Sequence, residues 1–229
     1  MIALKVTVPV ACFRKGFIRE FWETEDLPPP STCYGFLLSL VGERDRRRHI
    51  GARVCPALLA RSGPAGTPLW PERSAVLRTL WRVKDRKALP GTGSNLRPDY
   101  QELLTNTELV IWLDSAEEQF EGPSLAERVA IALDQPSRIE RFGGLSLGES
   151  THLVDEVRRL RPTDFGPARA FLLAERGRLS LPVWVDHVGS AGTRFVSGNL
   201  ELMTEIIPPS PEWMPKIEPP ESTPLNRGS

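Results

Sequence analysis

The residues whose spacing most resembles a chemical site form a glycine-rich loop at 143–150, Gly-Gly-Leu-Ser-Leu-Gly-Glu-Ser. Gly143 and Gly148 have the G-x4-G spacing of phosphate-cradling loops, but Glu149 stands where such a loop has its lysine. A carboxylate there repels phosphates, and the loop follows a helix pattern instead of a strand, so nucleotide hydrolysis is excluded. Glycine still lets backbone N–H groups approach a single phosphate, with Arg138 and Arg141 just upstream. A tight connection between a helix and a strand explains the glycines equally well.

Clusters of basic side chains are the second candidate for chemistry. A solvated face is the commoner explanation of any one cluster, whereas basic residues interleaved with aromatic ones are typical of single-stranded nucleic acid binding. The aromatic neighbours are Phe13, Phe17, Trp81 and Phe142, each of which is more often a core residue when taken singly. The clusters are Arg14, Lys15 and Arg19; Arg44, Arg46, Arg47 and Arg48; and Arg78, Arg82, Lys84, Arg86 and Lys87.

Few residues are available for catalysis. A metal-free RNA-cleaving site needs a general base and a cation, for which His49, Lys84 and Tyr34 are the candidates, although each has a structural explanation. His152 follows the glycine loop closely, and hydrogen bonding within that loop is the simpler role for it. The three cysteines are 21 and 22 residues apart with no CxxC pair, so they indicate buried small side chains and no metal site.

The composition is that of a globular protein with ordinary charge. The 229 residues are 40% hydrophobic and 25% charged, with 29 basic and 29 acidic side chains. A zero net charge argues mildly against a protein that binds nucleic acid alone, but it allows a local basic patch within a larger assembly. No apolar stretch is long enough to span a membrane, and the N-terminus lacks a signal-peptide pattern, so a cytoplasmic location is expected.

The elements that must position these residues alternate between strands and helices. Residues 2–10 alternate apolar and polar as a half-buried strand does, and Tyr34, Leu37, Leu38 and Val41 form one helical stripe after Pro28–Pro30. Strands are expected at 50–60 and 75–84, the second with one apolar and one basic face, and residues 84–97 suggest a projecting hairpin.

The second half of the chain repeats this alternation. Residues 109–113 predict a short strand buried on both faces, and Ser124 with Glu127 forms a capping box for a helix ending near Leu133. Further strands are expected near 152–158, 179–186 and 194–206, the last two paired through Gly189 and Gly192. From Pro208 the proline content predicts a mostly extended or disordered tail.

The order β-α-β(β)-β-α-β predicts an α+β chain of the ferredoxin-like class, the layout of RNA-recognition domains. We expect this domain to take up the first 158 residues, with the hairpin at 84–97 projecting from it. A small C-terminal β-hairpin region is expected at 161–207 and the proline-rich tail at 208–229. This fold serves many functions, so the order of elements does not by itself assign one.

Four segments in this order resemble the CRISPR-associated RAMP proteins, specifically the Cas-five family, in the variety known from Myxococcus-like type I systems. They are Leu-Lys-Val-Thr-Val-Pro at 4–9, Pro-Pro-Pro-Ser-Thr-Cys-Tyr-Gly-Phe-Leu-Leu-Ser-Leu-Val-Gly-Glu at 28–43, Asn-Leu-Arg-Pro-Asp-Tyr-Gln-Glu-Leu-Leu at 95–104, and Glu-Arg-Phe-Gly-Gly-Leu-Ser-Leu-Gly-Glu-Ser-Thr-His-Leu-Val-Asp-Glu-Val at 140–157. The match extends from residue 1 to about residue 160, and the combination is more specific than any one segment. The resemblance implies a ferredoxin-like RAMP domain at 1–160 with a protruding thumb hairpin within 61–106, followed by a small C-terminal β-rich region.

The resemblance implies a non-catalytic subunit that caps the 5′ handle of the CRISPR RNA in a Cascade complex. Its partners would be the backbone RAMP subunit and the large subunit, near the end where the protospacer-adjacent motif of target DNA is read. No cofactor or metal is expected, and the alternative is a metal-independent endoribonuclease that processes the precursor RNA. The residues expected to bind RNA are Arg14, Lys15, Arg19, Arg47, Arg78, Arg82, Lys84, Arg97, Arg141, Gly143, Gly144, Ser146, Gly148 and His152.

Overall fold

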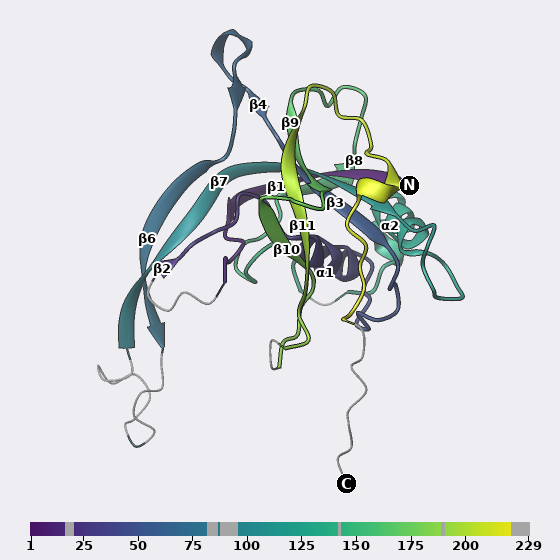
Figure 1. Ribbon diagram of the computed structural model, residues 1–229, viewed down its shortest axis with the longest axis horizontal. Coiled ribbons are helices and arrows are strands. Elements are labelled where there is room, and N and C mark those ends of the chain that lie inside the picture. The colour runs from purple at the N-terminus through teal and green to yellow at the C-terminus, as the bar shows by residue number, and fades with distance from the viewer. Residues whose placement is uncertain (17–20, 82–86, 88–95, 142, 189–190, 221–229) are drawn as a thin grey trace.

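The computed structural model describes residues 1–16, 21–81, 87, 96–141, 143–188 and 191–220. Nearly all of its strands belong to one nine-stranded sheet, whose main path runs β10-β11-β9-β3-β7-β1-β8 (Figure 1). Within the described residues, no helix is long and apolar enough to cross a membrane.

Four strands and two helices form the centre of the molecule. The strands are β1 (Ile2–Ala11), β3 (Arg53–Leu59), β7 (Leu96–Asp114) and β8 (Glu156–Arg159). They are antiparallel neighbours in the order β3-β7-β1-β8, with α1 (Pro30–Leu40) between β1 and β3 and α2 (Leu125–Asp134) between β7 and β8. Two β-α-β units therefore interleave, each with a strand of the other between its own strands.

Helix α2 begins as the sequence predicts, whereas α1 begins at Pro30 with Pro29 as its N-cap, so the expectation of Ser31 as the N-cap is wrong. Pro30 occupies the first turn of α1, where a missing N–H costs nothing, and Gly42 follows the helix with φ of +68°. A side chain on Gly42 would meet the carbonyl oxygen of Glu140 at 2.1 Å, so glycine is required there. Ser124 and Glu127 form the capping box of α2 in both directions.

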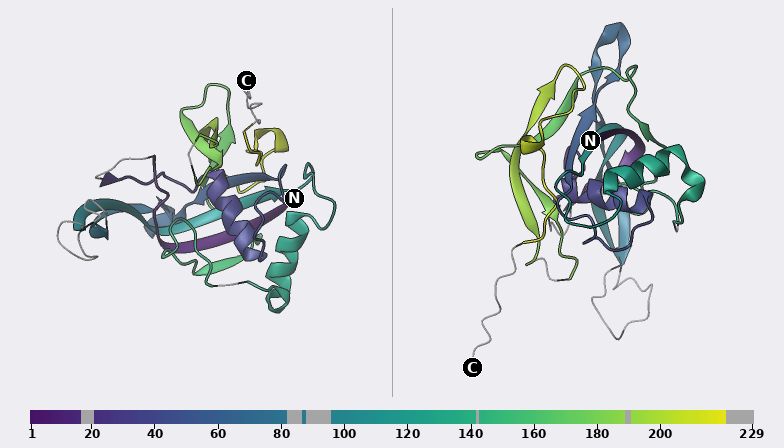
Figure 2. Two further views of the ribbon diagram at one scale, coloured as in Figure 1. Left: turned by 90° about the horizontal axis from the view of Figure 1, so that it is seen from below. Right: turned by 90° about the vertical axis from the view of Figure 1, so that its right-hand side faces the viewer.

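The sheet has an apolar core on each face. On the helix face, Leu4 and Val6 of β1 and Ile111 of β7 pack with Leu37 of α1 and Val129 of α2, all fully buried. The two views of Figure 2 show both helices lying against this part of the sheet. The second core, on the other face, contains the fully buried residues Cys55, Val110, Trp112, Ala168 and Met214. The sheet is thus buried on both sides at its centre.

The prediction of a short strand at 109–113 was wrong in length, because these residues are the end of the 19-residue strand β7. Polar residues at 105–108 obscured the continuity, and Asn106 has φ of +55° where the pairing with β1 is interrupted. The distal part of β7 pairs with β6 (Glu72–Trp81) in a long hairpin that extends away from the body (Figure 1).

Two smaller pieces accompany this hairpin. β2 (Phe21–Trp22) runs parallel to β7 opposite Tyr100 and Gln101. Preceding β6, β4 (Arg61–Ser62) and β5 (Pro68–Leu69) form a separate small hairpin around the 3-10 turn Pro64–Gly66. The region 61–106 therefore contains two hairpins, not the single one that the sequence suggested.

Three C-terminal strands continue the same sheet. The predicted pair is confirmed as β10 (Leu179–Trp184) and β11 (Arg194–Met203), which are antiparallel; Gly189 of their connection lies outside the described residues. The sequence analysis missed β9 (Ala168–Leu173), which joins β11 to β3. Its Ala-Arg-Ala-Phe-Leu-Leu sequence contains no β-branched residue, so nothing local marks it as a strand.

From residue 208, where a mostly extended or disordered tail was predicted, residues 208–220 contain little regular secondary structure but pack against the body. After the 3-10 turn Pro211–Trp213, Met214 and Ile217 are fully buried. Val54 donates to the carbonyl of Pro215 (2.9 Å), and Ile217 donates to that of Ala52 (2.8 Å). Proline removes hydrogen-bond donors but not acceptors or apolar surface, so this segment packs against β3 despite its composition. Residues 221–229 lie outside the described part.

Candidate nucleic-acid interface

The glycine loop is a folded turn anchored on the end of β1. Leu147 is buried beneath it, and its backbone N–H donates to the carbonyl of His152 (3.0 Å). Gly148 has φ of +102°, and a side chain there would meet the carbonyl oxygen of Cys12 at 2.7 Å. Gly143 and Gly144 are exposed, and a side chain on Gly144 would find its nearest neighbour, Leu153, at 3.4 Å. Gly143 has φ of +81°, so Gly143 and Gly148 both adopt a conformation that favours glycine, and Gly144 is the one of the three that does not.

His152 holds this loop to β1. Its Nδ1 accepts hydrogen bonds from the backbone N–H groups of Cys12 (3.1 Å) and Glu149 (3.3 Å), and only 8% of the residue is exposed. An Nδ1 that accepts twice leaves the proton of the neutral ring on Nε2. The structure thus places His152 as an anchor of the loop, in agreement with the simpler role expected for it.

Protonation of His152 is expected to loosen the loop. Burial lowers the pKa of the His152 imidazole below its ordinary value, an effect that Glu149 opposes and Arg78 supports. As pH falls below about 6.5, the unfolded chain takes up a proton that the folded chain does not, so the free energy of unfolding should fall. Urea unfolding at several pH values between 7.5 and 5.5 measures this dependence. The amide oxygen of an asparagine can accept the same hydrogen bonds but does not titrate. The free energy of unfolding of His152→Asn should therefore change less with pH than that of wild type over this range. An equal dependence of the unfolding free energy on pH in both proteins would contradict the role of His152 as the titrating anchor of the loop.

Glu149 ties the glycine loop to the base of the long hairpin. Its carboxylate accepts from Arg78 of β6 (2.8 Å) and from the side-chain amide of Gln101 of β7 (2.8 Å). Gln101 is only 1% exposed, and its amide oxygen also accepts from Arg78. Glu149, which stands where a nucleotide-hydrolysing loop has its lysine, therefore has a structural role: it docks the glycine loop onto the hairpin. Its partners are 48 and 71 residues away, so sequence spacing gave no sign of it.

Two of the predicted basic residues meet at Trp22. The guanidinium of Arg14 lies over the indole ring at 4.1 Å from its centroid, and that of Arg78 lies at 5.8 Å. Arg14 is exposed, and the 13–16 segment is held by pairing of Arg14 with Thr24. Lys15 in the same segment forms an ion pair with Glu23 (3.8 Å). Trp22 was not among the predicted residues, although a tryptophan between basic clusters is a usable signal.

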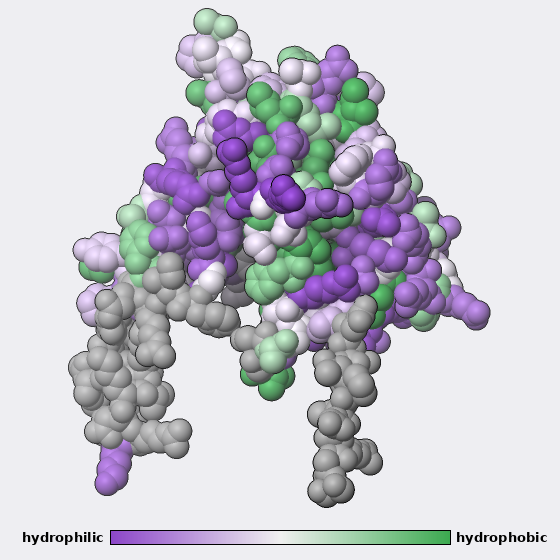
Figure 3. All heavy atoms as spheres, viewed as in Figure 1, coloured by the Kyte–Doolittle hydropathy of each residue, from purple (hydrophilic) through white to green (hydrophobic). Residues whose placement is uncertain are grey.

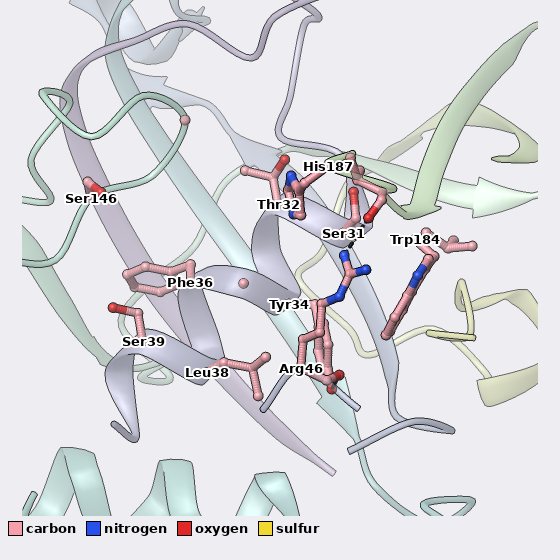
Figure 4. A pocket seen from close by; sticks show the side chains of 14 residues that line it. Ser31, Thr32, Tyr34, Phe36, Leu38, Ser39, Arg46, Ser146, Trp184 and His187 are labelled. Atoms are coloured by element: carbon pink, nitrogen blue, oxygen red, sulfur yellow. Dashed lines mark hydrogen bonds between the residues drawn. The ribbon is translucent and has the colours of Figure 1, made fainter. Parts of the chain in front are cut away.

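A groove runs beside the loop, along the exposed face of α1. It has a volume of about 390 Å³, and Ser146 and Gly148 of the loop line one side. Arg46, Trp184 and His187 line the other side; Figure 4 shows the Arg46 guanidinium beside Trp184, with Ser146 across α1 from them. The Arg46 guanidinium lies 4.4 Å from the centroid of the Trp184 ring and donates to the carbonyl of Val185.

The remaining predicted residues are not brought to this site or lie outside the described structure. Arg141 lines a different groove, beside Arg44 and the end of α1. Arg47 is exposed in the turn after α1, where its backbone N–H donates to Asp45. Arg19, Arg82 and Lys84 are outside the described residues, and only the backbone of Arg97 is described, within β7. Of the aromatic candidates, Phe13 is 2% exposed and belongs to the core; Phe17 and Phe142 are not described, and of Trp81 only the backbone is.

Two of the three residues considered for RNA cleavage, His49 and Tyr34, are built into the body of the protein, and Lys84 lies outside the described residues. His49 is fully buried; its Nδ1 bonds Glu118 (2.7 Å) and its Nε2 accepts from Arg128 (2.9 Å). Tyr34 is 4% exposed, donates to the carbonyl of Arg46 (2.8 Å), and has its pKa raised mainly by burial. Neither side chain has the access to solvent that a catalytic base for RNA requires.

The described residues contain no group of three His, Cys, Asp or Glu side chains able to hold a metal. Cys12, Cys33 and Cys55 are all buried and free, which confirms them as small core side chains. The candidate site thus consists of the loop, the base of the hairpin, Arg14 on Trp22, and the groove along α1.

The sequence and the fold have known counterparts among CRISPR-associated proteins. The chain is 51% identical over 219 residues to the CRISPR-associated protein Cas5 of Myxococcus xanthus (strain DK1622), covering 95% of this chain and 97% of that one. A chain of a solved CRISPR RNA-guided surveillance complex superposes with a TM-score of 0.58 over 89% of this chain and 90% of its own, at 14% identity. No known family profile matches the sequence.

The chain belongs to the Cas5 family of CRISPR-associated proteins, as the four sequence segments suggested. The likeness to the surveillance-complex chain shows that the two share a fold.

Proposed function

We propose that this protein is the non-catalytic subunit of a type I CRISPR Cascade complex that binds and caps the 5′ handle of the CRISPR RNA. The central β-α-β units would be the ferredoxin-like RAMP domain, and β6 with the distal part of β7 would be its thumb. Membership of the Cas5 family supports a role in such a complex. The further partners are the backbone RAMP subunit and the large subunit, near the end where target DNA is recognised, in the cytoplasm.

The observation that carries the handle-binding proposal is the docking of the glycine loop onto the base of the hairpin. Through Glu149, Arg78 and Gln101, the exposed glycines are fixed in position relative to Arg14. A prearranged backbone surface beside an exposed arginine suits a bent single strand, whose phosphates meet N–H groups while its bases splay outward.

Charge balance refines which residues would bind phosphate. Arg78 already has Glu149 as its partner, so its charge is largely matched before RNA arrives. The exposed backbone N–H groups at Gly143 and Gly144 are the better candidates among the described residues. The non-catalytic assignment draws support from the burial of Tyr34 and His49.

The test combines binding and cleavage of labelled CRISPR repeat RNA by the purified chain with EDTA present. Binding without cleavage is expected, with log K falling by about 0.7 per phosphate contacted for each tenfold rise in salt. A discrete cut at the handle boundary would establish the endoribonuclease instead. Absence of binding, or a salt slope near zero, would contradict the proposal.

A matched pair of variants tests the loop itself. Gly144→Asp adds a carboxylate at the surface without a backbone clash, and we expect it to weaken RNA binding about tenfold or more by repelling the phosphate. Gly144→Ala adds the same Cβ without charge and should bind within about twofold of wild type. Filter binding at one salt concentration measures both. Equal binding by the two variants would remove the loop from the interface and favour a subunit that holds protein partners only.

A further inference from the structure

A second groove lies on the other side of Val185, between the 13–16 segment and the β10–β11 hairpin. It has a volume of about 390 Å³ and is lined on opposite sides by Arg14 with Gly16 and by Pro182 with Phe195. Val185 lines both this groove and the one along α1, so the two are adjacent. A volume of this size accommodates a small planar group such as a nucleobase.

One wall of this groove is a stacked cation. Because the Arg14 guanidinium lies over Trp22 on one side, its other side is the one that a ligand reaches. A guanidinium is planar and weakly hydrated, so it stacks on a flat ring as well as pairing with charge. The aromatic residue Phe195, on β11, is 56% exposed. Figure 3 shows apolar side chains interleaved with strongly hydrophilic ones over β9–β11 on the face in view.

The charges around the groove disfavour a phosphate inside it. The carboxylates of Glu25 and Asp186 both line the groove. Asp186 accepts from the backbone N–H groups of Val188 and Gly192, which holds the turn after β10 in place. Carboxylates repel a phosphate but accept hydrogen bonds from the amino group of a base.

We propose that this groove holds one unpaired nucleobase, stacked on the outer side of the Arg14 guanidinium and flanked by Phe195. The inference deepens the proposed function and rests on it: the glycine loop positions the RNA backbone, and the groove accepts a base that turns away from that backbone. Arg14 acts here through its flat surface more than through its charge.

The distinguishing variant is Arg14→Lys, which keeps the positive charge but removes the planar surface. With wild-type handle RNA, Arg14→Lys should bind roughly tenfold more weakly, as expected for the loss of one base stack. With a series of handle RNAs each carrying one abasic position, one member should bind wild type and Arg14→Lys equally. The salt slope of Arg14→Lys should match that of wild type, since no phosphate contact is lost.

Two further variants complete the experiment. Phe195→Ala, at an exposed position, should give a loss that disappears with the same abasic RNA. Arg159→Lys, at an arginine that pairs with Asp134 of α2 away from the grooves (2.7 Å), should bind every RNA as wild type does. Equal affinity of Arg14→Lys and wild type for intact RNA would overturn the base site. A loss that persists with every abasic RNA would overturn it too, by assigning Arg14 to a phosphate. Failure of wild type to bind any handle RNA would instead overturn the proposed function, and this inference with it.

Discussion

Replacing Arg128 with methionine is expected to lower the free energy of unfolding by about 3 to 5 kcal/mol, because it leaves buried polar groups without their partner. Arg128 donates to Glu43 (2.6 Å), to Nε2 of His49 (2.9 Å) and to the carbonyl of Val41 (3.2 Å). The Glu43 side chain is 9% exposed. This network joins α2 to the end of α1 and to the turn before β3. Urea denaturation at pH 7 measures the loss.

The Glu43 carboxyl provides a second readout for the same variant. Burial raises its pKa, but hydrogen bonds from Arg128 and from the backbone of Arg44 and Asp45 outweigh that effect and lower it to about 2. The stabilisation is therefore complete above pH 4.5 and is lost as pH falls towards 2. Arg128→Met should be less stable at pH 7 and should show a weaker dependence on acid. Arg138→Met, at an exposed position with one bond to Gln135, is the control and should change stability by less than about 0.5 kcal/mol. A loss below about 1 kcal/mol for Arg128→Met would show that the network relaxes around the change.

Gly148→Ala is expected to displace the glycine loop and to weaken handle binding by at least about tenfold. The backbone at φ of +102° strains any L side chain, and the new Cβ would lie 2.7 Å from the carbonyl oxygen of Cys12. Strain of this kind costs on the order of 1 to 3 kcal/mol and can be relieved by moving the loop away from β1. Breaking the His152 contact with Cys12 is the direct consequence.

Hydrogen exchange at the Cys12 amide measures this displacement without reference to RNA. Faster exchange is expected in Gly148→Ala, and unchanged exchange in Gly144→Ala, where space is available. Faster exchange with undiminished RNA affinity would separate the loop's structure from binding. Unchanged exchange would mean that the turn accepts alanine.

The sequence predicted the elements whose signals are local. The strand at 2–10 and the helix stripes were visible because most of one face of each is buried, although Val10 is exposed, and the capping box of α2 needs only Ser124 and Glu127. The elements that the sequence analysis missed depend on pairing with residues far away in the chain. β9 is a strand because β3 and β11 lie on either side of it, and residues 214–217 are ordered because the edge of β3 accepts them.

In the candidate site, too, local features were predictable from the sequence and long-range contacts were not. The glycines and His152 could be selected from residue type and spacing, and contacts within the loop bear out the anchoring role of the histidine. The pairing of Glu149 with Arg78, and of Arg14 with Trp22, depends on how the hairpin and the 13–24 segment fold back on each other. His49 was considered as a catalytic base because nothing in the sequence shows that its two ring nitrogens are hydrogen-bonded to Glu118 and Arg128 in the interior.

Residues 215–217, which pair with the edge of β3, also set the timing of folding during synthesis. They emerge about 160 residues after Val54, with which Pro215 forms its hydrogen bond. At ribosomal rates, this edge stays uncovered for roughly 10 to 30 s after β3 has been made. Throughout that interval its N–H and C=O groups are open to a strand of another nascent chain. Slowing translation before residue 215 should therefore increase aggregation of the newly made protein, even though the finished fold is unchanged.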